Sequence, residues 1–166
     1  MHPELRNLQL GAMVLVFVLL FAGRLMKGSP RLTSAGLEFR LKPVVVFSRA
    51  LALPLYFLLF AYPLWISQQS IPPWLLILLF VAVMFGLYQY PGTIVLTDGA
   101  VLQRFWLRKE KRIAYGDVLN VLAAGGGAVT RVYGRDGALI THTFNHAGSA
   151  EFRTELAGRT GKPVVQ

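Results

Sequence analysis

The 166-residue sequence contains no cysteine, and this absence excludes a disulfide framework, a thiolate metal site and a thiol nucleophile. Charge is also missing from a long central stretch, because no charged residue occurs from Ala50 to Thr97. Acidic residues are few, with 8 Asp and Glu against 17 Lys and Arg. The uneven distribution of charge predicts an apolar, lipid-facing N-terminal half and a water-facing C-terminal half.

The formal net charge of +9 is of the kind that nucleic-acid-binding proteins carry. Basic residues beside apolar helices have another explanation, however, because they set the orientation of a protein in a membrane. We therefore expect no nucleic-acid partner.

The apolar stretches predict three membrane-spanning helices. The first is the uncharged segment Asn7–Gly23. A secretory signal peptide is the alternative, but here the basic residues follow the apolar stretch and no small-residue cleavage pattern comes directly after it. The long uncharged run is broken by a polar turn over residues 67–73, which predicts a helical hairpin over Val44–Ile66 and Pro73–Tyr90.

The positions of the basic residues predict the orientation of these helices. The linker between the first two holds six basic residues and one acidic residue, whereas the turn over residues 67–73 holds no charge. Positive residues remain in the cytoplasm, so the N-terminus is expected outside and the C-terminal domain inside. Four aromatic residues are expected as membrane-interface anchors: Trp65, Trp74, Tyr88 and Tyr90.

The C-terminal half has the pattern of short strands separated by glycine turns. Asp98-Gly99 and Asp136-Gly137 are the strongest turn signals. The segment Ser149–Gly158 has the pattern of an amphipathic helix with an N-cap at Ser149 and a glycine stop at Gly161. Six strands are predicted: Thr93–Thr97, Ala100–Trp106, Lys111–Tyr115, Val118–Ala123, Ala128–Tyr133 and Ala138–Phe144.

Four stretches of this half carry a resemblance to a known family: Ile94–Gly99, Lys111–Val118, Tyr133–Gly137 and Phe152–Leu156. Together they resemble the bacterial PH-like domains that are attached to transmembrane helices. The similarity covers about Gly92 to Gly161. It implies a curved antiparallel barrel capped by a helix, with no particular ligand and no catalytic residues.

The expected fold class is therefore three transmembrane helices followed by a cytoplasmic PH-like barrel with a C-terminal helix. The expected location is the bacterial inner membrane, in a multi-pass arrangement. The expected divisions are residues 1–27 (first helix), 28–43 (basic linker), 44–90 (helical hairpin), 91–161 (PH-like domain) and 162–166 (tail).

The basic linker has a strand pattern of its own. Leu37, Phe39 and Leu41 alternate with charged residues, as in a half-buried strand. Six strands are one fewer than a complete PH-like barrel has. We therefore expect the linker to dock on the C-terminal sheet as an extra strand or hairpin.

The densest basic cluster is interleaved with Phe105 and Trp106, and consists of Arg104, Arg108, Lys109, Lys111 and Arg112. It predicts a contact with an acidic partner or with anionic lipid. A solvated hairpin that follows the positive-inside rule is the alternative. His142 and His146 are four residues apart but fall in a strand and a loop, so we expect no metal site and no cofactor.

The sequence shows no paired carboxylates and no phosphate-binding loop, so we expect no enzyme activity. The favoured function is a membrane-anchored adaptor, or an accessory or assembly subunit of a larger membrane complex, whose partners are membrane lipids and another membrane protein. Homo-oligomers are compatible with the apolar helices. An anionic-lipid-binding surface module and an unrecognised enzyme or transporter are the alternatives.

Overall fold

The computed structural model describes residues 10–11, 14–15, 18, 28–48, 50–51, 72–88 and 90–165. The chain divides into two compact units. The first comprises Met1–Leu25 and Pro43–Gln89, and the second comprises Met26–Lys42 and Tyr90–Gln166. The polypeptide therefore passes between the units three times.

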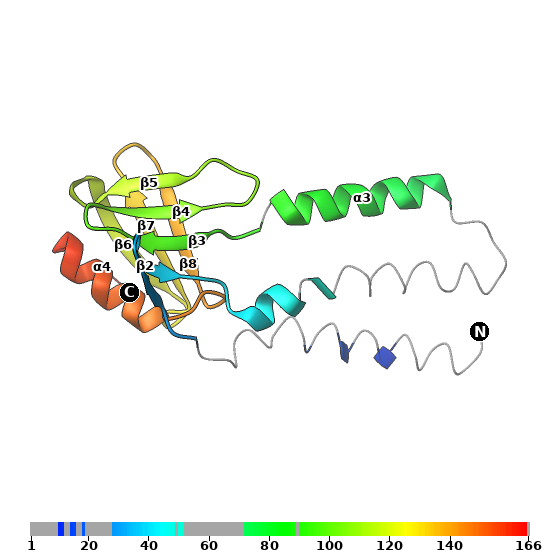
Figure 1. Ribbon diagram of the computed structural model, residues 1–166, viewed down its shortest axis with the longest axis horizontal. Coiled ribbons are helices and arrows are strands. Elements are labelled where there is room, and N and C mark those ends of the chain that lie inside the picture. The colour runs from blue at the N-terminus through cyan, green and yellow to red at the C-terminus, as the bar shows by residue number, and fades with distance from the viewer. Residues whose placement is uncertain are drawn as a thin grey trace. The chain divides into compact units, whose positions relative to one another are not determined.

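The second unit contains an antiparallel five-stranded sheet in the order β1-β2-β3-β4-β5 (Figure 1). Leu37 of β2 lies opposite Leu96 of β3, which is the docking that the alternating pattern of the linker predicted. The two segments join because each has an apolar face to bury. The strands are β1 (Arg31–Thr33), β2 (Gly36–Phe39), β3 (Thr93–Leu96), β4 (Ala100–Arg104) and β5 (Lys111–Ala114).

A second sheet has the order β8-β7-β6-β9, and the C-terminal helix α4 (Ser149–Thr160) precedes its last strand (Figure 1). The short helix η1 (Tyr115–Asp117) connects the sheets. The six predicted strands and the helix are confirmed, with ends that differ by at most two residues. The strands are β6 (Val118–Ala124), β7 (Val129–Gly134), β8 (Leu139–Thr143) and β9 (Val164–Val165).

One core joins the two sheets and α4. Phe152 and Leu156 of α4 are fully buried in it, because their spacing places both on one face of the helix. Gly148, and not Ser149, is the N-cap of α4, whereas the predicted stop at Gly161 is confirmed by its left-handed conformation. The other core residues are Phe39, Ile94, Leu96, Val101, Ile113, Val118, Val121, Val132 and Ile140.

In the first unit the structure describes the helix α3 (Pro73–Tyr88). Its 16 residues extend about 24 Å at 1.5 Å per residue, short of a hydrocarbon layer of about 30 Å. Within the described ranges, no helix is both long enough and apolar enough to cross a bilayer. The prediction of a three-helix transmembrane region is therefore wrong, as is the multi-pass membrane location derived from it. The expected spans Asn7–Gly23 and Val44–Ile66 lie largely outside the described residues.

Candidate interaction site

The predicted basic cluster lies on the hairpin that joins β4 to β5. We name residues 104–112 the basic hairpin. Arg104 ends β4, and its Nε atom lies 2.9 Å from an oxygen of Glu110 on the returning arm. The guanidinium carbon of Arg108 lies 4.0 Å from the centre of the Phe105 ring, a cation–π contact. Arg104 and Arg108 therefore help to order the hairpin.

Lys111 has an internal contact as well. Its ammonium group donates a hydrogen bond of 3.0 Å to the carbonyl oxygen of Leu139, the first residue of β8. It also lies 6.0 Å from the Phe105 ring. Lys111 thus connects the edge strand of the first sheet to the edge strand of the second. Its ammonium group is engaged in a contact within the fold, so it is less available to a partner.

Lys109 and Arg112 present their side chains to solvent. Beside them the tip of the hairpin exposes two apolar side chains, Trp106 at 74% and Leu107 at 49% of their surface. The sequence indicated that Trp106 lies within the basic cluster, but it missed Leu107. The signal was the Phe-Trp-Leu run directly before Arg108, which is more apolar than the tip of a solvated hairpin requires.

The basic hairpin therefore brings all five predicted site residues onto one element. The same hairpin combines an exposed aromatic residue, an exposed aliphatic residue and several positive charges. Tryptophan and arginine are the residue types that most often dominate the energy of protein interfaces. Such a surface can bind a partner that offers an apolar pocket with acidic groups around it.

Three of the four residues predicted as membrane-interface anchors lie in the described part of the chain. Trp74 and Tyr88 lie in the first turn and at the last residue of α3, and both are exposed. Tyr90 follows the helix and is half-buried, and Trp65 lies outside the described residues. No observation on the described residues tests the anchoring role, which stays a prediction.

A second polar cluster, not predicted from the sequence, surrounds the segment Asn145–Gly148, which we name the junction loop. Its carbonyl and amide groups bond to residues of the second unit that lie near the ends of its stretch Met26–Lys42. Lys42 N–H donates to Asn145 O (2.9 Å), Ala147 N–H donates to Arg40 O (2.8 Å), and Gly148 N–H donates to Gly28 O (2.8 Å).

His146 completes this set of contacts. Its Nδ1 atom accepts the backbone N–H of Thr143 (3.1 Å), so the ring proton lies on Nε2, which donates to the carbonyl oxygen of Gly92 (2.9 Å). One loop therefore bonds to both ends of the stretch Met26–Lys42 and, through His146, to the start of the stretch that begins at Tyr90, all within the second unit.

His142 packs beside His146, with ring centroids 5.0 Å apart. Its Nε2 atom donates to Ala147 O (3.1 Å), and its buried Nδ1 makes no hydrogen bond. Burial, with a smaller effect from His146, lowers the pKa of His142 to about 3. Burial thus holds His142 neutral, and both histidines make hydrogen bonds within the fold. Among the described residues, no three His, Asp or Glu side chains come together as metal ligands.

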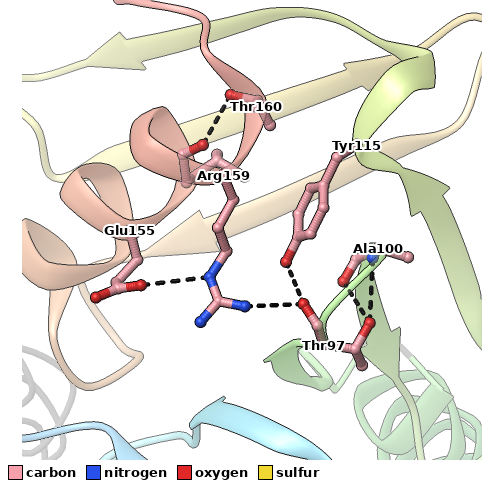
Figure 2. Close-up of polar contacts among 7 residues, drawn as sticks. Thr97, Ala100, Tyr115, Glu155, Arg159 and Thr160 are labelled. Carbon is pink, nitrogen blue, oxygen red and sulfur yellow. Dashed lines mark hydrogen bonds and ion pairs between the residues drawn. The ribbon is translucent and has the colours of Figure 1, made fainter.

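A third polar contact joins α4 to the first sheet (Figure 2). The carbonyl oxygen of Thr97 accepts hydrogen bonds from the Tyr115 hydroxyl (2.6 Å) and from Arg159 (2.9 Å). Arg159 also pairs with Glu155 one turn earlier, at 3.3 Å. Burial raises the pKa of Tyr115, so the hydroxyl remains a donor. The contact closes α4 against the β3–β4 turn and contains no nucleophile with an adjacent base.

The predicted family resemblance is not supported. The strands form two separate hydrogen-bonded sheets, with no ladder between β5 and β6, and not one continuous barrel. The transmembrane helices that the resemblance implied are not seen among the described residues. No family model, no curated protein and no solved structure matches this chain.

Proposed function

We propose that this protein is a non-enzymatic adaptor that binds another protein through its basic hairpin. The observation that supports this proposal is the exposure of Trp106 and Leu107 at a tip flanked by basic side chains. Exposing a large aromatic ring to water is unfavourable, and the loss is recovered when a partner covers it. The basic residues restrict the choice of partner to an acidic surface.

The exposed surface of α3 also supports a subunit role. The helix carries no charged residue, and nine of its large apolar side chains are exposed. Contiguous apolar surface of this extent is typical of interaction sites. These side chains are Trp74, Leu76, Ile77, Leu78, Phe80, Val81, Met84, Phe85 and Tyr88.

The test is a pull-down of the tagged full-length protein from its native cells, with partners identified by mass spectrometry. We expect a stoichiometric protein partner whose recovery falls at least tenfold when Trp106→Ala and Leu107→Ser are combined. These side chains are exposed, so the fold should persist. The charge variant Lys109→Gln with Arg112→Gln should lower the amount of partner recovered. It should also make that recovery less sensitive to salt.

The matched control changes two basic residues elsewhere. Arg131 and Arg135 are exposed in β7 and in the turn after it, so Arg131→Gln with Arg135→Gln removes the same charge without touching the basic hairpin. Equal partner recovery by the hairpin variants and the wild type would contradict the proposal. Recovery of no protein, together with salt-sensitive binding to anionic vesicles that Trp106→Ala abolishes, would establish the lipid-binding alternative instead.

A further inference from the structure

Strand β6 has one hydrogen-bonding edge that is only partly covered. Six of its seven residues pair with β7 on one side, and Leu119 lies at an irregularity in the register. On the other side the two-residue strand β9 pairs in parallel at Val121 with Val164 and at Leu122 with Val165. Among the residues that the structure describes, no strand pairs with the remaining positions along this edge. A strand edge without a ladder partner is a template for another strand.

The ammonium group of Lys162 substitutes for backbone donors at the start of this edge. It donates hydrogen bonds to the carbonyl oxygen of Val118 and to that of Leu119, the latter at 3.1 Å. These are carbonyl groups of β6 itself, next to the irregular register between Val118 and Asn120. The segment Lys162–Val165 therefore covers β6 by a mixture of strand pairing and side-chain capping.

Few contacts hold this segment in place. Helix α4 ends at Gly161, whose left-handed conformation (φ 65°) turns the chain back toward β6. Val164 packs against the core, whereas Val165 is 52% exposed. Two ladder positions, one apolar side chain, one ammonium group and the hydrogen bond from Lys162 N–H to Thr160 Oγ1 are a small set of interactions compared with the full length of β6.

We propose that the edge of β6 is a strand-addition site for an extended segment of a partner protein, and that Lys162–Val165 occupies it in cis as a displaceable competitor. The contacts of the cis segment define the chemistry of the partner. It carries a β-branched apolar residue at the position of Val164 and a basic residue two positions earlier, which reaches the carbonyl groups of Val118 and Leu119. A longer strand gains ladder bonds to β6 that β9 does not make.

The probe is a synthetic peptide with the sequence of residues 161–166, carrying a fluorophore. It is added to the full chain and to a chain that ends at Gly161. We expect the shortened chain to bind at least tenfold more tightly, because the intramolecular competitor is gone. A control peptide with aspartate in place of Val164 and glutamate in place of Lys162 should not bind. Equal affinity of the two chains for the probe would overturn the proposal.

A cross-linked variant keeps the test decisive if the shortened chain does not fold. Leu122 and Val165 face each other across the β6–β9 ladder, and the chain has no other cysteine, so Leu122→Cys with Val165→Cys permits a single disulfide. Oxidation should abolish peptide binding to the full-length variant, and reduction should restore it at least fivefold. Peptide binding that is the same in the oxidised and the reduced variant would contradict the proposal that the segment is displaceable.

The Trp106→Ala variant should bind the peptide as the wild type does, which separates this site from the basic hairpin.

Discussion

His142 is a titratable residue with no exposed surface, and its ring stacks on that of Phe152 with centroids 4.5 Å apart. Its pKa is about 3 in the fold, lowered mainly by burial and further by His146, Arg153 and Lys42. An unfolded histidine has a pKa near 6.5. Below that pH the unfolded chain binds a proton that the folded chain does not, so stability falls as pH decreases.

We therefore expect the free energy of unfolding to decrease by several kcal/mol between about pH 6.5 and pH 3, since one pKa unit corresponds to about 1.4 kcal/mol. Urea unfolding followed by circular dichroism at a series of pH values measures this dependence. The variant His142→Phe keeps an aromatic ring against Phe152 and removes the titrating group. A pH dependence unchanged in that variant would show that other groups cause it.

Gly36 is a residue that no other amino acid can replace without strain. It has a φ of 125° at the first position of β2, and a Cβ atom there would lie 2.2 Å from the carbonyl oxygen of Leu96. Gly36→Ala should lower the free energy of unfolding by more than about 2 kcal/mol, because backbone strain and a steric overlap act together. Gly99 is the matched control, since a Cβ atom there meets nothing within 4 Å. Comparable losses for Gly36→Ala and Gly99→Ala in chemical denaturation would argue against this explanation.

At the scale of elements, α4 contains two glycines that should respond to alanine with opposite signs. Gly158 is an exposed interior position of the helix with open space around it. Gly158→Ala should stabilise the protein by about 0.5–1 kcal/mol, because glycine is a poor helix former. Gly161 ends the helix with a φ of 65°, so Gly161→Ala should destabilise it by about 1 kcal/mol. Thermal unfolding of both variants tests the signs, and the same sign for both would contradict the assigned helix end.

The contact between α4 and the β3–β4 turn depends on the Tyr115 hydroxyl (Figure 2). Tyr115→Phe removes the 2.6 Å hydrogen bond to the carbonyl oxygen of Thr97 and keeps the ring. We expect a loss of about 0.5–1.5 kcal/mol, the usual net value of one hydrogen bond. Tyr133→Phe, in a half-buried position of β7, is the control. Denaturant unfolding of both variants provides the comparison. An equal loss in the free energy of unfolding would contradict the role assigned to the Tyr115 hydroxyl.

At the scale of the whole molecule, the junction loop bonds to three chain ends of the second unit, next to the positions where the chain leaves or enters it. Hydrogen exchange should show slow amides at Lys42, Ala147 and Gly148, comparable with those of the core strands, because each donates to a backbone carbonyl of this cluster. His146→Ala removes the hydrogen bonds of the imidazole ring to Thr143 and Gly92. It should accelerate exchange at all three amides together. Acceleration at the mutated loop alone would show that the crossings are not coupled.

Much of the second unit could be predicted from the sequence. Alternation of apolar residues and the Asp98-Gly99 and Asp136-Gly137 turns located the strands, because period-two burial and turn chemistry are local properties. The docking of Leu37 beside Leu96 was also predictable, since both segments carry the same pattern. The prediction of a three-helix transmembrane region was wrong. Apolar composition alone suggested helices long enough to span a bilayer, but the described helix α3 has only 16 residues.

The sequence by itself determined where strands, turns and the C-terminal helix lie, and it located the basic residues of the hairpin. Only the tertiary structure decided which of those residues remain available, because the Lys111 ammonium group reaches Leu139, which is 28 positions away in sequence. It likewise decided that His146 meets Gly92 and that Lys162 meets Val118. These contacts join segments separated by 44 to 54 positions, and no local pattern specifies them, because they follow from how the sheets and α4 pack around one core.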